Sequence, residues 1–135
     1  MIELPARRRD TYRLVNARWQ TERAGVPAKG KVLKGIAASP GIIRGNIRII
    51  RGEHEFGKLL AGEVLVCPYT NPAWTPLFAT ATAVVTETGG LASHAAIVAR
   101  EYGIPSVMGI PGITRTLKTG QEVQVDGNRG IVSQF

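Results

Sequence analysis

The stretch from Ala83 to Pro105 constrains the fold of this chain more than any other part of the sequence. Its first four residues are apolar or β-branched and are typical of a buried strand. The glycine pair Gly89-Gly90 then permits a tight turn, and Ser93 is a favoured residue for capping the start of a helix. The pattern therefore predicts a strand, a glycine turn and a helix through Tyr102, a combination common in α/β proteins.

Short apolar runs divided by glycine and proline make up most of the chain from Lys31 onward. Runs of this length that are rich in β-branched residues predict β-strands. We expect strands at Val32–Ala37, Ile47–Ile50, Val64–Val66 and Ala83–Thr86, helices within Glu53–Leu60 and Pro72–Ala81, and a closing hairpin of Gln121–Asp126 with Gly130–Phe135. Strands mixed with helices, only some of which cross between strands, predict a layered α/β domain.

The predicted helix places His94 in its first turn, beside backbone N–H groups that have no helical partner. The positive end of a helix disfavours imidazolium and attracts phosphate, so it favours a neutral, nucleophilic ring. Histidine is an accepted covalent intermediate in group transfer. The pattern indicates a phosphoryl-carrying histidine, but a packed or surface histidine behind a common glycine turn is the alternative.

Positive charge is concentrated at the start of the chain. Residues 1–51 contain twelve Lys or Arg and three acidic residues, whereas residues 52–135 contain five and seven. Tyr12, Val15 and Trp19 recur at helical spacing, which predicts a basic amphipathic helix with a linker over residues 1–29, followed by one domain over residues 30–135. The scattered basic residues and few aromatics argue against a nucleic-acid-binding module.

The sequence also argues against membrane, secretory and metal-binding classes. No run approaches the roughly 18 to 20 apolar residues that cross a bilayer, and no apolar segment follows the first basic residues as a secretory signal requires. Cys67 is the only cysteine, and no metal-ligand spacing surrounds it or the two histidines, His54 and His94. We therefore expect a cytoplasmic domain without a metal site or a membrane partner.

Four ordered motifs resemble the mobile (phosphohistidine, swivelling) domain of the PEP-utilising enzymes, which include pyruvate phosphate dikinase, PEP synthase and rifampicin phosphotransferase. The motifs are Gly35–Gly41 with Gly45, Asn71–Leu77, Gly89–Gly109 and Asp126–Gly130. The resemblance covers residues 30–134, and four motifs in order are far more specific than one. It implies a three-layer β/β/α swivelling domain.

The resemblance also implies roles for individual residues. His94 stands at the position of the phosphorylated histidine, which receives phosphate on Nε2. Thr75 matches a threonine that forms a hydrogen bond near that histidine. The turn expected to face the phosphate comprises Gly89, Gly90 and Ser93.

Two charged residues in the same segment each have more than one possible role. Glu87 is expected either to tune the imidazole electrostatically or to be an acid exposed to water at a strand end. Arg100 lies six residues beyond His94, which places it off the histidine face of a helix. We interpret Arg100 as a structural ion-pair or interface residue rather than a phosphate ligand.

The implied function is that of a phosphotransferase component which shuttles phosphate between a nucleotide site and a PEP, pyruvate or other acceptor site. Such sites belong to ATP-grasp and PEP- or pyruvate-binding partner domains. A TIM-type barrel of the PEP-binding kind alone needs about 250 residues, so it does not fit within these 135 residues. ATP, PEP and Mg²⁺ are accordingly expected on the partners, with no cofactor bound by this domain. A non-catalytic regulatory or interaction module that retains the fold is the alternative.

Overall fold

A computed structural model describes residues 32–135, so the predicted basic helix and linker at residues 1–29 lie outside the described residues. The described elements are β1 (Val32–Lys34), β2 (Ile36–Ser39), β3 (Ile42–Ile49), the 3-10 helix η1 (Glu53–Lys58), β4 (Val64–Cys67), the 3-10 helix η2 (Pro72–Trp74), α2 (Leu77–Thr80), β5 (Ala83–Thr86), α3 (His94–Tyr102), β6 (Ser106–Met108), α4 (Ile113–Thr116), β7 (Glu122–Asp126) and β8 (Ile131–Gln134).

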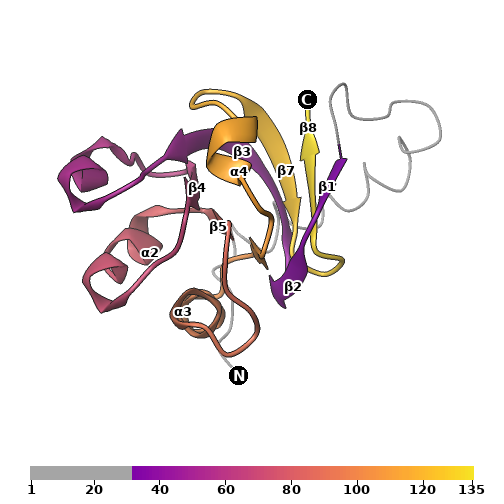
Figure 1. Cartoon of the computed structure of the whole chain (residues 1–135), viewed down its shortest axis with the longest axis horizontal. Coiled ribbons are helices and arrows are strands. Elements are labelled where there is room, and N and C mark those ends of the chain that lie inside the picture. The colour runs from indigo at the N-terminus through magenta and orange to yellow at the C-terminus, as the bar shows by residue number, and fades with distance from the viewer. Residues whose placement is uncertain (1–31) are drawn as a thin grey trace.

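The strands follow the order β1-β8-β7-β3-β4-β5-β6-β2, and β3 joins the two parts of this arrangement (Figure 1). Residues Ile42–Asn46 of β3 pair antiparallel with β7, whereas Ile47–Ile49 pair parallel with β4. Strands β3, β4, β5 and β6 are parallel to one another, and β1, β2, β7 and β8 pair antiparallel with their neighbours. One long strand therefore serves two sheets that face each other.

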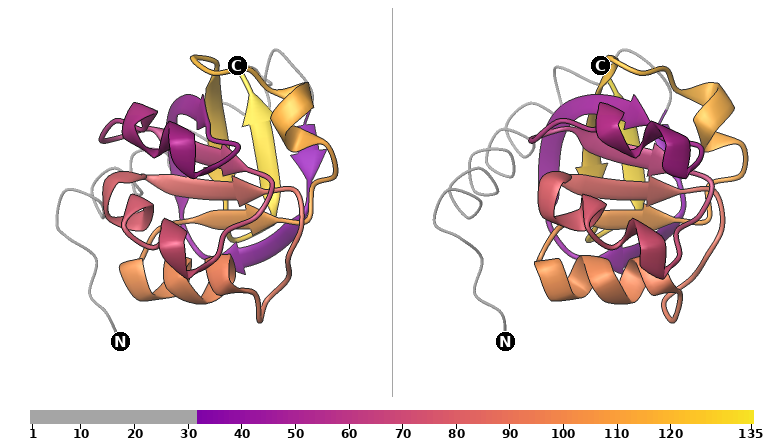
Figure 2. Two further views of the ribbon diagram at one scale, coloured as in Figure 1. Left: turned by 60° about the vertical axis from the view of Figure 1, so that its left-hand side comes forward. Right: turned by 90° about the vertical axis from the view of Figure 1, so that its left-hand side faces the viewer.

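Two hydrophobic cores separate three layers. Ile47, Val85 and Val125 belong to the core between the two sheets. Phe78, Leu65 and Ala96 belong to the core between the parallel strands and the helices α2 and α3, which lie side by side in both views of Figure 2. A large aliphatic or aromatic side chain buried in this way contributes about 1.5 to 3 kcal/mol relative to an exposed one. The expected three-layer β/β/α arrangement is confirmed.

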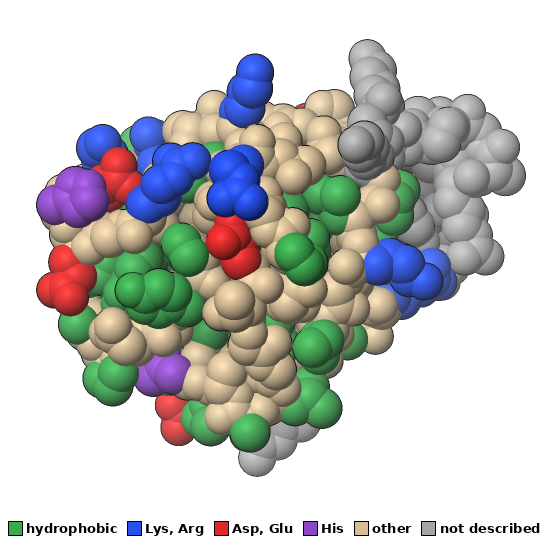
Figure 3. All heavy atoms as spheres, viewed as in Figure 1, with side chains coloured by type: hydrophobic (Ala, Val, Ile, Leu, Met, Phe, Trp, Pro, Cys, Tyr) green, Lys and Arg blue, Asp and Glu red, His purple; other side chains and the backbone are tan. Residues whose placement is uncertain are grey.

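Basic side chains are unevenly distributed over the face of the molecule seen in Figure 3. In the upper and right-hand parts of the face seen in Figure 3, Lys and Arg side chains gather. The lower part of the same face, which α3 occupies in Figure 1, carries hydrophobic side chains, and none of the Lys or Arg drawn in colour lies there. Within residues 32–135, no helix is both long enough and apolar enough to cross a membrane.

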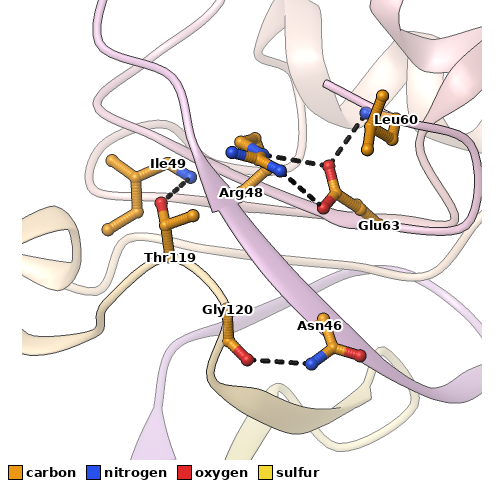
Figure 4. Close-up of polar contacts among 7 residues, drawn as sticks. All are labelled: Asn46, Arg48, Ile49, Leu60, Glu63, Thr119 and Gly120. Carbon is orange, nitrogen blue, oxygen red and sulfur yellow. Dashed lines mark hydrogen bonds and ion pairs between the residues drawn. The ribbon is translucent and has the colours of Figure 1, made fainter. Parts of the chain in front are cut away.

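Polar side chains fix β3 to the loops on both sides of it (Figure 4). Arg48 forms a two-pronged ion pair with Glu63, with both N–O distances at 3.0 Å, and Glu63 also accepts the N–H of Leu60 at 2.8 Å. Asn46 donates its side-chain amide to the carbonyl of Gly120 at 2.8 Å. Paired, bidentate contacts of this kind are the stronger class of charged hydrogen bond, so they help to hold the shared strand in register.

The expected element order is confirmed, with three corrections. The strand predicted at Ile47–Ile50 is the second half of β3, which begins at Ile42. The run Val32–Ala37, predicted as one strand, is two strands that meet at Gly35 and belong to different sheets. The predicted helix over Pro72–Ala81 is η2 followed by α2. Pro76 stands between them, and it has no N–H with which to continue the hydrogen bonds of one helix. The strand β6 and the helix α4 were not predicted, since elements of three and four residues show no period.

The parallel strands determine where the functional side chains gather. Because β4, β5 and β6 run in the same direction, the loops that leave their carboxyl ends share one edge of the sheet. Thr70 follows β4, His94 follows β5 and Gly109 follows β6. Ligand sites of open α/β sheets characteristically lie outside the carboxyl ends of their strands.

Candidate functional site

The turn between β5 and α3 has the local structure that the sequence predicts. Gly89 has a φ of +108°, a conformation that side chains rarely adopt. Ser93 is the N-cap of α3, and its hydroxyl accepts the N–H of Ala96 at 3.3 Å. The helix ends at Gly103, which is left-handed with a φ of +69°. His94 is therefore the first residue of α3.

Ser93 also closes the turn from within. Its hydroxyl donates to the carbonyl of Gly90 at 2.8 Å, and its backbone N–H reaches the same carbonyl at 3.0 Å. The Ser93 hydroxyl thus forms hydrogen bonds within the turn and the helix cap. A direct contact between this hydroxyl and phosphate stays a prediction. In the part of the chain that the structure describes, the backbone N–H groups of His94 and Ala95 have no hydrogen-bond acceptor. Free N–H groups at a helix start are suitable donors for an anion.

Two threonine hydroxyls contact the His94 ring, one at each nitrogen. Thr70 Oγ1 lies 2.7 Å from Nδ1, and Thr75 Oγ1 lies 3.2 Å from Nε2. The ring of the buried residue Phe78 meets the imidazole edge to face, with centroids 6.0 Å apart and an interplanar angle of 84°. The ring is half-buried, so it is held on one side and reachable from solvent on the other.

Thr70 is the site residue that sequence reasoning missed. It directly precedes the motif that begins at Asn71, and its hydroxyl makes the shorter contact with the imidazole. A signal was present in the sequence, because two threonines bracket the turn that starts with Asn71 and Pro72. Asn71 caps this turn by accepting the N–H of Ala73 at 3.0 Å, which fixes both threonines relative to β4.

The two glycines of the pair differ in their surroundings. A Cβ added to Gly89 would lie 3.1 Å from Ser93 Oγ, in a backbone conformation that already disfavours a side chain. A Cβ added to Gly90 would have no atom within 4 Å, and Gly90 does not have a positive φ. Glycine at position 89 is therefore required by the fold, whereas at position 90 the chain itself sets no such requirement.

Arg100 has a structural position away from the imidazole. Its guanidinium donates to the carbonyl of Ala38 at 2.8 Å and to the carbonyl of Leu91 at 2.7 Å. These acceptors are backbone carbonyls, so among the described residues Arg100 forms no ion pair, contrary to that part of the expectation. The side chain ties β2 to the segment directly before Ser93, and so supports the turn from behind.

Glu87 faces a different element. Its Oε2 accepts the hydroxyl of Thr114 at 2.6 Å and the backbone N–H of Thr114 at 3.0 Å. The hydroxyl bond from Thr114 is the main cause that lowers the pKa of the Glu87 carboxyl, and the nearby cations Arg115 and Arg51 act in the same direction. The carboxylate is thus partly buried and bound at α4, neither free in water nor in hydrogen-bond contact with His94.

The remaining candidate groups have no role at this site. Cys67 is fully buried, and burial is the main cause that raises the pKa of its thiol, with Glu87 contributing, so it is unreactive. His54 lies exposed in η1. Among residues 32–135 no cluster of three or more His, Cys, Asp or Glu side chains could hold a metal ion.

The mobile domain of PEP-utilising enzymes is the family whose model matches this chain, over residues 59–130. The matched region contains His94 and both threonines that contact it. The chain belongs to the PEP-utilising mobile-domain family.

Relatives of this mobile domain include a phosphotransferase and several PEP synthases. It is 52% identical over 99 residues to the uncharacterized phosphotransferase YvkC of Bacillus subtilis (strain 168), a match that covers 73% of this chain. It is 50% identical over 101 residues to phosphoenolpyruvate synthase of Pyrococcus furiosus, which covers 75% of this chain. In both cases the chain spans only 12% of the length of the relative. The mobile domain therefore corresponds to one small part of much larger proteins.

A solved structure supports the same relationship. The solution structure of an Enzyme I protein matches with a TM-score of 0.52 and 33% sequence identity, covering 58% of this chain and 33% of that one. This chain is thus a phosphotransferase-related mobile domain, of the kind found in multidomain PEP synthases and Enzyme I.

Proposed function

We propose that this mobile domain carries a phosphoryl group on His94 between a nucleotide site and a PEP, pyruvate or other acceptor site on partner domains. The observation that carries the proposal is the imidazole itself, held by hydroxyls at both nitrogens and half-exposed at the start of α3. The family membership supports the same assignment.

The chemistry requires a neutral ring with a free electron pair on Nε2. That pair attacks the phosphorus of a donor, a P–N bond forms, and the P–O bond to the leaving group breaks with its electrons going to oxygen. In the second transfer an acceptor oxygen attacks phosphorus, and the P–N electrons return to Nε2. The free N–H groups of His94 and Ala95 lie where an anion would be stabilised during both steps.

Thr75 has two uses in this scheme. Before transfer its hydroxyl lies 3.2 Å from Nε2, which keeps the ring oriented. When phosphorus approaches Nε2, the hydroxyl is displaced from the electron pair and becomes available to a phosphoryl oxygen. Glycine at position 90 leaves the surface beside the turn open for a visiting group.

The donor and acceptor sites are assigned to partners. The relatives are about eight times longer than the matched region, which leaves room for an ATP-grasp domain and a PEP- or pyruvate-binding domain, whether on the same chain or on separate ones. ATP, PEP and Mg²⁺ belong to those partners in this proposal, and the mobile domain binds no cofactor of its own.

The test is transfer of labelled phosphate to the chain from ATP or PEP, in the presence of the partner proteins of the same organism. The wild type is expected to acquire an acid-labile, base-stable label, and His94→Gln is expected to lose it. His54→Gln is the matched control, since His54 is exposed in η1, and it should keep the label. A wild type that stays unlabelled with both donors contradicts the proposal and favours a non-catalytic module.

A further inference from the structure

The contact between Thr70 and His94 bears on which ring nitrogen can react. Thr70 Oγ1 lies 2.7 Å from Nδ1, and the hydroxyl has no other partner among the described residues. Thr75 makes the longer contact, 3.2 Å, with Nε2. Both threonines belong to the segment between β4 and α2. The side chains of one segment therefore contact both nitrogens of a ring that belongs to α3.

A neutral imidazole carries one proton, and its position decides the chemistry. If the proton is on Nδ1, this nitrogen donates to Thr70 Oγ1, and Nε2 accepts from the hydroxyl of Thr75. If the proton is on Nε2, both hydrogen bonds reverse and the Nε2 electron pair is lost to bonding. A threonine hydroxyl can donate or accept, so both contacts fit either arrangement, and the need for a free electron pair on Nε2 selects the first one.

We infer that Thr70 is a positioning residue that holds the ring proton on Nδ1 and leaves the Nε2 electron pair free for phosphorus. This inference rests on the proposed function, because only phosphoryl transfer at Nε2 requires that tautomer. In the transfer the P–N bond forms at Nε2 and the donor P–O bond breaks, while the Nδ1 proton stays in its bond to Thr70. The hydroxyl thereby also stabilises the positive charge that the ring gains.

The surrounding structure fixes Thr70 for this role. The side chain of Asn71 accepts the N–H of Ala73 at 3.0 Å, and the carbonyl of Asn71 accepts the N–H of Trp74 at 2.8 Å. Trp74 is itself buried, so the turn that directly follows Thr70 is held in place. On the other side of the ring, the edge-to-face contact with Phe78 restricts rotation of the imidazole. The short Nδ1 contact is therefore built into the fold.

The test reads the tautomer in the full, unphosphorylated chain by nitrogen-15 NMR of the imidazole rings, with no donor present. The wild type is expected to show a protonated Nδ1 and an unprotonated Nε2 at His94. Thr70→Val, which keeps the shape and removes the hydroxyl, is expected to shift the proton toward Nε2. Thr70→Ser is expected to restore the wild-type pattern, and the ring of His54 is an internal reference that should not change.

Transfer kinetics give a second readout. Thr70→Val is expected to slow labelling of His94 by about tenfold, the scale of one lost hydrogen bond, with an unchanged requirement for the partner. A wild-type ring protonated on Nε2, or a Thr70→Val ring with the wild-type nitrogen pattern, overturns the inference. If the tautomer shifts as expected but the wild type is never labelled, the role of Thr70 stands and the proposed function fails.

Discussion

Gly89 and Gly90 are adjacent in the sequence but differ in backbone conformation. Substitutions at the two positions should therefore differ in their effects on stability and on labelling of His94. Gly89 needs its φ of +108°, and a Cβ there would also press against Ser93. We expect Gly89→Ala to lower the free energy of unfolding by about 1 to 3 kcal/mol, the cost of a strained backbone conformation. Urea unfolding of the wild type and the variant measures this difference.

Gly90→Ala is the matched comparison for that substitution. Because a Cβ there meets no atom within 4 Å, the free energy of unfolding should change by less than about 0.5 kcal/mol. If the turn faces the phosphate, the added methyl group should still slow labelling of His94 by about ten- to a hundredfold through misplacement of the visiting group. Equal labelling of Gly90→Ala and wild type would remove Gly90 from the phosphate-facing turn.

The carboxylate of Glu87 gives a prediction about pH. Its pKa in the folded chain is lowered, chiefly by the hydroxyl of Thr114. Its stabilising contribution is therefore present above the unfolded-state pKa of about 4.3 and is lost as the pH falls through the lower folded value. Glu87→Gln should be less stable than wild type by about 1 kcal/mol at pH 7, and this gap should close toward pH 3.

Denaturant unfolding of both proteins at pH 7 and pH 3 measures the gap. Other carboxylates with lowered pKa values, including Glu55 and Glu63, titrate in both proteins and cancel in the difference. A gap that does not depend on pH would contradict the role of the ionised carboxylate. Labelling of His94 should be unaffected by Glu87→Gln, since the carboxylate is bound at Thr114 rather than at the imidazole.

At the candidate site, sequence reasoning predicted the position of His94 at the start of a helix but not the whole of its environment. His94, Ser93 and the glycines are close together in the chain, so local turn and cap preferences were enough to predict their arrangement. Thr70 lies 24 residues before His94, so the threonine pair around Asn71 and Pro72 was visible in the sequence but its contact with the ring was not. Glu87 was expected either to tune the imidazole or to be exposed to water at a strand end, whereas the fold brings it to Thr114, which is 27 residues away.

Among the elements, α3 depends on Arg100 for its connection to β2. The guanidinium donates to the carbonyls of Ala38 and Leu91, which lie 62 and 9 residues away. We expect Arg100→Met, which keeps the aliphatic stem, to lower the free energy of unfolding by about 1 to 3 kcal/mol, because two hydrogen bonds from a charged group are lost. Thermal or urea unfolding measures the loss.

Lys118→Met is the control for the removal of a cation. Lys118 is exposed, and in the described part of the chain its ammonium has no hydrogen-bond or ion-pair partner. Its replacement should change the free energy of unfolding by less than about 0.5 kcal/mol. Equal effects of the two substitutions would assign the loss in Arg100→Met to charge rather than to the two carbonyl contacts.

The elements that sequence reasoning misjudged are those whose boundaries are set by distant parts of the chain. The strand break at Gly35 is one, because a Cβ there would collide with the carbonyl of Met108 and lie 2.7 Å from Ile110 Cγ1. The N–H of Gly35 is also bonded to the carbonyl of Gly130 at 2.8 Å. A run of apolar residues cannot reveal that one half pairs with β8 and the other with β6.

For the whole molecule, the proposed carrier role gives a prediction about the surface around His94. Leu91, Ile97 and Tyr102 are exposed by 59%, 44% and 42%, and they flank the histidine along α3 and the turn before it. Ile97 is three residues after His94, so the two side chains share a face of the helix. Any protein that brings a phosphorus atom to Nε2 must come close to this apolar face, which the exposed Arg100 borders where it bonds to the carbonyl of Leu91.

Ile97→Lys should therefore weaken transfer from the partner without damage to the fold. A lysine inside the contact would be an unpaired charge taken out of water, at a cost of at least about 1.4 kcal/mol, which corresponds to a tenfold change in affinity. We expect the partner concentration that gives half-maximal labelling of His94 to rise by about tenfold or more. The maximal rate at saturating partner should change much less, since the imidazole and its threonines are untouched.

Leu60→Lys is the control, because Leu60 is as exposed as Leu91, at 59%, but follows η1, at the upper left of Figure 1, whereas α3 lies at the bottom. It adds the same charge to the chain, so any long-range electrostatic effect on the partner appears in both variants. A selective effect of Ile97→Lys locates the docking face around His94. Equal concentration dependence in the two variants would mean that the partner approaches the imidazole from another direction.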